Sequence, residues 1–193
     1  MLYLAGLSLV LATHSLTAFA PAVRDTLVRR LGKPVYVAGY SAISLFGLGL
    51  LVVGWARFQN VQIYHPPFWM RHVTYGLMFA ALLCLAATVL PEGHVKRTLK
   101  YPAVVAVIFW GAAHLFANGD LRSLLLFGVF LVYSVLDRVR KGFGPQLQPS
   151  PEGAAPYSPP KLRFDIAAGI LAGVGWLAIY FALHPYIAGV SLR

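Results

Sequence analysis

Two histidines are the side chains best placed to do chemistry within the apolar segments of this chain. His14 and His114 each lie well inside a long apolar run, whereas the six acidic residues all lie at or beyond the ends of such runs. Burying an imidazole in hydrocarbon costs a few kcal/mol unless the ring finds a partner. The sequence therefore predicts a specific partner for each of these two rings.

Two kinds of partner suit His14 and His114. One is a b-type haem held between helices, for which a pair of histidines can supply the axial ligands. The other is a hydrogen bond to a serine or threonine on a neighbouring helix, which contributes roughly 1 kcal/mol. The residue types alone do not separate these two hypotheses, and they single out no catalytic residue.

The remaining four histidines fall at or near segment ends. His65 and His94 lie in predicted loops and are interpreted as interfacial residues. At 1.5 Å per residue, His14 lies about 3 Å to one side of the middle of its segment, and His114 about 7 Å to the opposite side. His72 and His184 lie nearer the level of His114. The runner-up ligand pair is therefore His114 with either of them, although position beside Arg71 makes His72 typical of a headgroup contact.

Residues 101–120 form the element that must position His114. This stretch has membrane-spanning length and no charge before Asp120. Trp110, His114 and Asn118 are each four residues apart, so a helix places them on one face. Trp110 and Asn118 are therefore candidate cofactor-binding residues beside His114. Asn118-Gly119 is a pair that readily leaves the helix, so the helix is predicted to end there.

The composition identifies an integral membrane protein. Of 193 residues, 59% are hydrophobic and only 11% are charged, against about 25% charged in soluble domains. The net charge of +10 does not indicate a nucleic-acid partner, because the basic residues cluster at the ends of apolar runs, where the lipid bilayer favours them. A single cysteine, Cys84, excludes an intramolecular disulfide and covalent c-type haem attachment.

The apolar runs predict an all-α, polytopic bundle of six transmembrane helices at about residues 1–23, 37–55, 72–90, 101–120, 121–136 and 164–190. In the second, Ser41, Ser44, Gly47 and Gly54 recur on roughly one side, which favours close helix packing. The loops after the first, third and fifth spans carry twelve Lys and Arg, against four on the other side. The positive-inside rule then predicts that both termini are non-cytoplasmic.

The domain organisation follows from one change in composition. Residues 142–163 hold six of the thirteen prolines, with several glycines, serines and glutamines, which is typical of a solvated linker. We therefore expect a five-span core over residues 1–141, a Pro-rich cytoplasmic linker over 142–163 and a sixth transmembrane helix over 164–193. The absence of an internal repeat and of a carboxylate in mid-membrane disfavours ion-coupled transport.

Several short motifs occur together in this chain. They are His14-Ser15, Pro66-Pro67-x-Trp69-x-Arg71-His72, Trp110-x-x-Ala113-His114-Leu115-x-Ala117-Asn118-Gly119-Asp120, Leu124-Leu125-Leu126-Phe127-Gly128 and Asp137-Arg138. The set resembles the NnrU family of bacterial membrane proteins, which is similar to plant 15-cis-ζ-carotene isomerase. The resemblance covers nearly all of residues 1–140 and is less distinct beyond.

The resemblance implies a multi-pass protein of the bacterial inner (cytoplasmic) membrane. Members of the family are associated with denitrification and with nitric oxide or nitrite metabolism, which implies respiratory or denitrification membrane enzymes as partners. The isomerase relatives bind haem b through two histidines, whose motif positions fall on His14 and His114 here. The resemblance thus implies a haem b cofactor with these two residues as its metal ligands.

One residue departs from the family pattern. The family usually has His-Pro where this chain has Tyr101-Pro102, which puts isomerase activity in doubt. Two alternatives therefore stand beside a haem protein of denitrification. One is a haem-dependent cis-trans isomerase of a carotenoid-like polyene, the enzyme activity this chain would have if it is one. The other is a non-catalytic membrane assembly or scaffold protein without haem.

Overall fold

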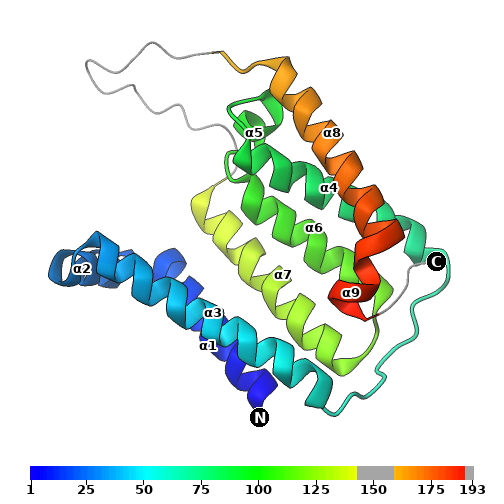
Figure 1. Ribbon diagram of the computed structural model, residues 1–193, viewed down its shortest axis with the longest axis horizontal. Helices are drawn as coiled ribbons and strands as arrows, with labels where there is room; N and C mark the ends of the chain where they lie inside the picture. The colour runs from blue at the N-terminus through cyan, green and yellow to red at the C-terminus, as the bar shows by residue number, and fades with distance from the viewer. Residues whose placement is uncertain (143–158, 190–193) are drawn as a thin grey trace. The chain divides into compact units, whose positions relative to one another are not determined.

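The computed structural model describes residues 1–142 and 159–189, and the elements it assigns there are helical. Figure 1 shows them in chain order. They are α1 (Leu2–Phe19), α2 (Pro21–Leu31), α3 (Lys33–Arg57), α4 (Met70–Val89), α5 (His94–Leu99), α6 (Pro102–Ala117), α7 (Leu121–Lys141), α8 (Leu162–Ala178), the π-helical turn η1 (Ile179–Leu183) and α9 (His184–Ala188). The all-α prediction is confirmed for the described residues.

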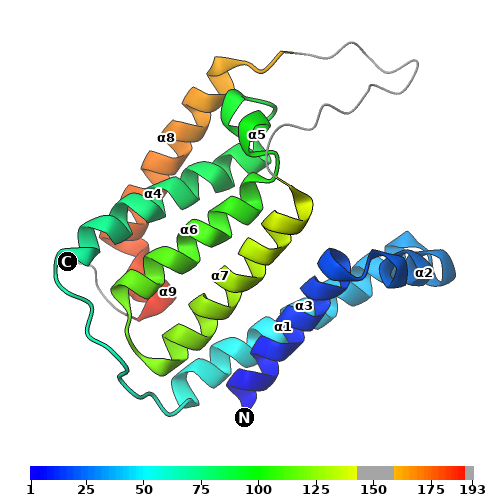
Figure 2. The same ribbon diagram turned by 180° about the vertical axis from the view of Figure 1, so that it is seen from behind.

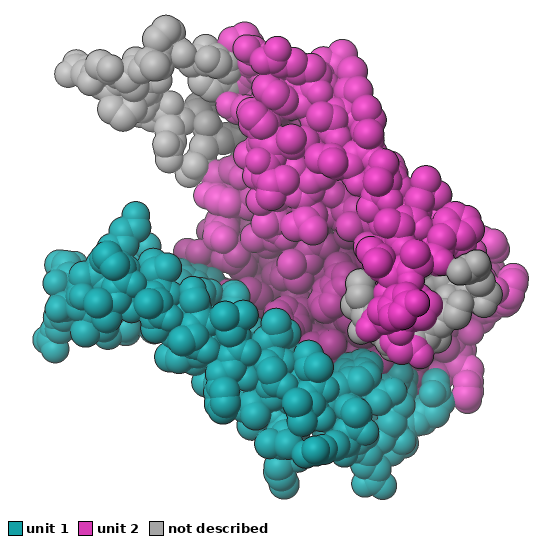
Figure 3. All heavy atoms as spheres, in the orientation of Figure 1, with its two compact units in different colours: residues 1–63, 120–122 teal, residues 64–119, 123–193 magenta. Residues whose placement is uncertain are grey.

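The chain forms two compact units, coloured separately in Figure 3. Unit 1 comprises residues 1–63 and 120–122, and unit 2 comprises residues 64–119 and 123–193. His14 belongs to unit 1, whereas His72, His114 and His184 belong to unit 2. The five-span core expected for residues 1–141 therefore includes helices of both units.

Unit 1 is built on close packing of α1 against α3. A Cβ atom on Gly6 would lie 2.5 Å from the Leu51 nitrogen and 2.7 Å from the Gly47 oxygen, so only glycine allows this approach. Gly54 meets the Tyr3 backbone in the same way, and Ser44 donates to the Thr13 hydroxyl at 3.5 Å. The small-residue side predicted for the second span is thus where α1 packs.

Unit 2 is built around α4, which packs against α6 and α8. The Thr74 hydroxyl donates to the Ala113 carbonyl oxygen at 3.1 Å, which joins α4 to α6. The Trp176 indole donates to the Tyr75 carbonyl oxygen at 3.1 Å, which joins α8 to α4. Figures 1 and 2 show α7 beside α6, where a Cβ atom on Gly111 would lie 3.0 Å from the Phe127 oxygen.

Four of the described helices are long and apolar enough to cross a membrane: Leu2–Phe19, Lys33–Arg57, Met70–Val89 and the continuous stretch Leu162–Tyr186. A fifth, Pro102–Ala117, is apolar but shorter. Large apolar side chains remain exposed on them, such as Leu45 at 68% and Phe46 at 63% on α3, as expected for surfaces that face lipid. Six crossings and the orientation of the termini stay predictions.

The observed bounds differ from the predicted spans, most clearly in the fourth and fifth spans and in two of the loops. The fourth expected span is the shorter helix α6, because Asn118 already has extended φ and ψ of −129° and 123°. The fifth runs on to Lys141 and takes Asp137 and Arg138 into the helix as buried residues. The predicted first span 1–23 ends at Phe19, and α2 runs from Pro21 into the predicted loop 24–36; the predicted loop 92–100 contains α5. Of the predicted linker 142–163, residues 143–158 lie outside the described residues.

Candidate functional site

The ring orientation of His114 is fixed within α6. This helix begins with Pro102 at its first position, where the missing N–H of proline is tolerated. The Nδ1 atom of His114 lies 2.8 Å from the Trp110 carbonyl oxygen, one helical turn earlier. A carbonyl oxygen can only accept, so Nδ1 carries the proton and Nε2 of the neutral ring keeps its lone pair. This tautomer can ligate a metal through Nε2.

Aromatic side chains of α6 and α7 surround the His114 ring. Phe127 stacks on it with ring centroids 4.3 Å apart and an interplanar angle of 20°. The Trp110 ring lies 5.2 Å from His114 and 4.8 Å from Phe127. A ring held between its own carbonyl bond and a stacked neighbour has little rotational freedom, so the direction of Nε2 is set before any ligand arrives. Trp110 thus lies beside His114, as its spacing predicted.

The carboxyl end of α6, just beyond His114, is held by a tyrosine from a distant segment. The Tyr64 hydroxyl is hydrogen-bonded to the Leu115 carbonyl oxygen and lies 2.9 Å from the Asn118 carbonyl oxygen. Tyr64 also donates its backbone N–H to Gly119 at 3.0 Å. The carbonyl groups of Leu115 and Asn118 lie at the end of α6, where the last carbonyl groups have no partner within the helix. Tyr64 therefore fixes the last turn of α6, on which His114 lies.

Asn118 has a different place from the one its spacing predicted. It is the C-cap residue of α6 and no longer continues the helical face of Trp110 and His114. Its side-chain amide donates to the His114 carbonyl oxygen at 2.9 Å. The helix ends at Ala117, one residue before the helical face of Trp110 and His114 would reach Asn118. The Asn118 side chain therefore supports the backbone of His114 and does not lie beside its ring.

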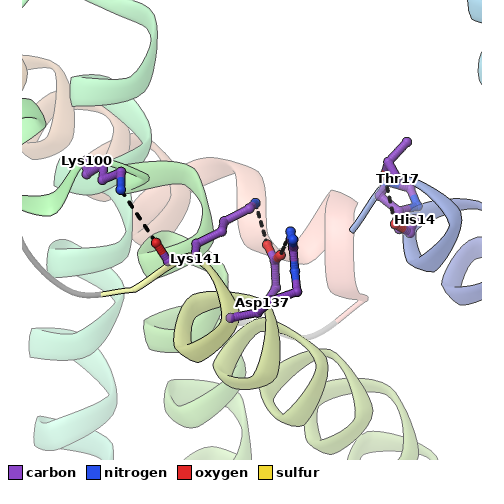
Figure 4. A network of polar contacts seen from close by, with 6 residues as sticks. His14, Thr17, Lys100, Asp137 and Lys141 are labelled. Atoms are coloured by element: carbon purple, nitrogen blue, oxygen red, sulfur yellow. Dashed lines mark hydrogen bonds and ion pairs between the residues drawn. The ribbon is translucent and has the colours of Figure 1, made fainter. Parts of the chain in front are cut away.

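His14 repeats the local geometry of His114 in unit 1. Its Nδ1 atom lies 2.8 Å from the Val10 carbonyl oxygen, again four residues back, so its Nε2 also keeps the lone pair. The Thr17 hydroxyl donates to the His14 carbonyl oxygen at 2.8 Å, as Figure 4 shows. The Tyr40 ring of α3 lies 5.6 Å from the His14 ring at a tilt of 58°.

The two runner-up histidines have different surroundings, both in unit 2. His72 lies near the start of α4, edge-on to Phe68 at 6.1 Å and to Tyr75 at 6.5 Å. His184 begins α9 directly after the π-helical turn η1 and lies near enough to His114 to interact with it electrostatically. Unit 2 therefore brings His184 toward His114 and gives His72 aromatic neighbours.

The remaining histidines have the peripheral positions expected of them. His94 lies at the first position of α5, where its Nδ1 is 2.8 Å from Asp165 and its side chain is 59% exposed. Among residues 1–142 and 159–189, no group of three or more His, Cys, Asp and Glu could hold a metal ion.

Comparison with known proteins decides the family. The family model described as NnrU protein matches residues 2–192. The chain belongs to the NnrU family. No curated protein and no solved structure shows a significant match to the chain. Together with the apolar helices, the match identifies this NnrU-family chain as a multi-pass membrane protein, and it extends the resemblance predicted for residues 1–140 into the last helix.

Tyr101, the residue that departs from the family pattern, precedes α6 as its N-cap and donates no side-chain cap bond. Three cationic groups lie near its ring: Lys141 at 4.9 Å, Lys100 at 5.0 Å and Arg138 at 6.0 Å from the ring centroid. Tyr101 lies at the opposite end of α6 from the His114 turn, since they bracket the helix from before Pro102 to near Ala117. Its contacts here are with cations.

Proposed function

We propose that this NnrU-family protein binds haem b in the membrane, with His114 as one axial ligand and His14 as the other. The observation that carries the proposal is the shared ring geometry of the two histidines. Each donates its Nδ1–H to the carbonyl four residues earlier, at 2.8 Å. Such a bond fixes the tautomer and raises the basicity of the other nitrogen, which is how metal-ligating histidines are commonly held.

The residues near His114 fit a macrocycle in a second respect. Phe127 and Trp110 give its surroundings an aromatic, apolar character, which suits the flat hydrophobic face of a porphyrin. When bound, haem b would supply one-electron redox chemistry or a site for a small ligand such as nitric oxide. The protein residues would bind and orient it and shield it from water.

The hypothesis that these histidines bond one helix to another finds less support. Within the described residues, the hydrogen bond recorded for each ring goes to its own helix and not to a serine or threonine of a neighbour. The Ser44 hydroxyl, which could have reached across from α3, donates instead to Thr13. The second nitrogen of each half-buried ring is better explained by a ligand from outside the chain.

Family membership supports a role in denitrification and in nitric oxide or nitrite respiration at the inner membrane, alongside the enzymes of those pathways. The isomerase alternative needs an exchangeable axial position on reduced haem. His184, which lies near enough to His114 to interact with it electrostatically, is the residue that would hold the haem in place of His14. Conversion of a cis-carotene by the reduced protein would establish that activity, and no conversion would leave the redox role.

The ligand assignment is tested by haem content in four single variants. His14→Ala and His114→Ala should each lose the bis-histidine spectrum of the purified, haem-supplied protein, because one axial ligand is removed. His65→Ala, at an interfacial loop position, is the matched control and should keep it. Loss in His184→Ala with retention in His14→Ala would move the second ligand to α9 and overturn the His14 assignment. If His114→Ala kept the bis-histidine spectrum, His114 would not be a ligand and the proposed pair would be wrong.

A further inference from the structure

A surface outside the proposed haem site lies on α2, the helix that joins α1 to α3 at one end of unit 1 (Figure 1). None of its 11 residues is buried. Both neighbouring helices are long and apolar enough to cross a membrane, so the segment between them turns back at the membrane surface. A helix in this position lies where the headgroups meet the acyl chains.

One face of α2 carries an apolar stripe. Val23, Leu27 and Leu31 are each four residues apart, so the helix places them on the same face. Both ends of the stripe are open, since Val23 is 50% exposed and Leu31 is 52% exposed. The packing of α2 on α1 and α3 therefore leaves much of this stripe without a protein neighbour. Helices that lie on a membrane bury such a stripe at the boundary of the acyl chains.

Arginines border this stripe on both sides. At about 100° per residue, Arg30 and Arg24 lie about 20° beyond its two edges. An arginine in such a position lays its methylene stem on the lipid while its guanidinium reaches the headgroups. Arg29 lies about 160° from Leu27, the centre of the stripe, and it donates to the Thr26 hydroxyl at 2.9 Å. Arg29 therefore faces away from the stripe, although it is the sequence neighbour of Arg30.

The α2 segment carries more positive than negative charge. Residues 21–33 hold one carboxylate, Asp25, and four cations, Arg24, Arg29, Arg30 and Lys33. Asp25 pairs with Arg24 at 2.8 Å, and within residues 1–142 and 159–189 no ion pair involves the other three cations. One acidic side chain, Glu152, lies outside those ranges and could neutralise only one of the three. At least two positive charges therefore remain for an anion from outside the chain.

We propose that α2 lies on an anionic membrane surface, with Val23, Leu27 and Leu31 among the upper acyl carbons and Arg30 at a lipid phosphate. The apolar stripe and the excess cations are the two sources of attraction that hold a helix in this plane. The positive-inside prediction places this segment at the cytoplasmic leaflet, which is the anionic one. An acidic protein surface would match the charges, but the open stripe and the position between two crossing helices favour lipid.

Spin labels at two opposite positions of α2 test the placement in the full-length protein. Leu31→Cys lies on the stripe, whereas Ala22→Cys lies about 180° round the helix at an exposed position. The native Cys84 is buried, so the nitroxide attaches to the introduced thiol. In nanodiscs of phosphatidylcholine with phosphatidylglycerol, oxygen dissolved in the lipid should reach the label at position 31. A neutral, water-soluble nickel chelate should reach the label at position 22.

Two neighbouring arginines provide a charge-matched comparison. Arg30→Gln and Arg29→Gln each remove one exposed cation, and the label moves to Val23→Cys, away from both changes. The readout is the fraction of phosphatidylglycerol at which half of the labels are immersed. Arg30→Gln should raise that fraction about fivefold, because it removes a basic group at the headgroup level. Arg29→Gln should raise it by about twofold or less, because its side chain faces away from the membrane.

Three results would overturn the proposal. They are equal nickel access at positions 22 and 31, equal immersion in pure phosphatidylcholine, and an Arg29→Gln effect as large as that of Arg30→Gln. A stripe that stays in water in every bilayer would exclude lipid and leave a protein as its partner. Because the readout is the depth of α2 and not haem absorbance, the outcome does not depend on the haem proposal.

Discussion

At the scale of single residues, the two membrane histidines share one device. A ring nitrogen bonded to the carbonyl four residues back needs no partner from another helix, so each histidine can be oriented by its own helix. What distinguishes His114 is the stacked Phe127 ring and the support of the next turn by Tyr64. His114 is therefore the better ordered of the two proposed ligands.

Tyr64→Phe tests that support. The change removes the hydroxyl that binds carbonyl oxygens of Leu115 and Asn118 and leaves the ring in place. The free energy of unfolding should fall by about 1–2 kcal/mol, because a hydrogen bond is lost and helix-end carbonyls are left unsatisfied. Denaturant titration in detergent measures it. Tyr186→Phe, at a position that is 89% exposed, should be neutral, and equal loss in both variants would refute the role of Tyr64.

At the scale of elements, glycines decide how closely helices approach. Gly54 of α3 faces the Tyr3 backbone of α1, whereas a Cβ atom on Gly49 of the same helix would meet nothing within 4 Å. Gly54→Ala should therefore destabilise the protein by about 1–3 kcal/mol, since backbone atoms must move apart. Gly49→Ala should be neutral or slightly stabilising. The two variants are compared by their unfolding midpoints. Equal midpoints would contradict the packing of α1 on α3.

Local spacing explains which of these features could be predicted from the sequence. The small-residue side of α3, the pairing of Trp110 with His114 and the end of α6 at Asn118 each depend on residues a few positions apart. The support of α6 by Tyr64 joins residues 51 positions apart. The capping of α5 by Asp165, which accepts from the Val95 N–H at 2.9 Å, joins residues 70 apart. Such contacts leave no periodic signal, so hydropathy patterns could not reveal them.

The π-helical turn is a further feature that periodicity missed. Trp176 and Tyr180 stack with ring centroids 5.1 Å apart and planes 5° apart, as a four-residue spacing predicts. His184, four residues after Tyr180, follows the π-helical turn η1, where the helix widens. Such turns inside helices often accompany functional sites, and this one precedes the histidine that interacts with His114.

At the scale of the whole molecule, the six predicted crossings place the connections after the first, third and fifth spans on the same side of the membrane. The basic segments after α4 and at the end of α7 meet at one end of unit 2, where Lys100 contacts the Lys141 carbonyl. Asp165 near the start of α8 contacts His94 at the same loop. That arrangement supports the placement of the third and fifth connections on one side of the membrane.

Cysteine labelling tests the sidedness. The native Cys84 is buried, so Lys161→Cys and Arg57→Cys, both at exposed positions, would be the reactive sites. In intact cells an impermeant maleimide should label Arg57→Cys and spare Lys161→Cys until the membrane is opened, because the positive-inside rule places residue 161 in the cytoplasm. The reverse pattern would invert the topology, and labelling of both would contradict the number of crossings.

The measurement that bears most directly on the central claim is the reduced-minus-oxidised absorbance spectrum of the purified protein after expression with ample haem. A bis-histidine haem b predicts a Soret band with sharp α and β bands on reduction. A protein that stays free of haem under these conditions, while folded by its unfolding transition, would contradict the account and leave His14 and His114 as structural residues.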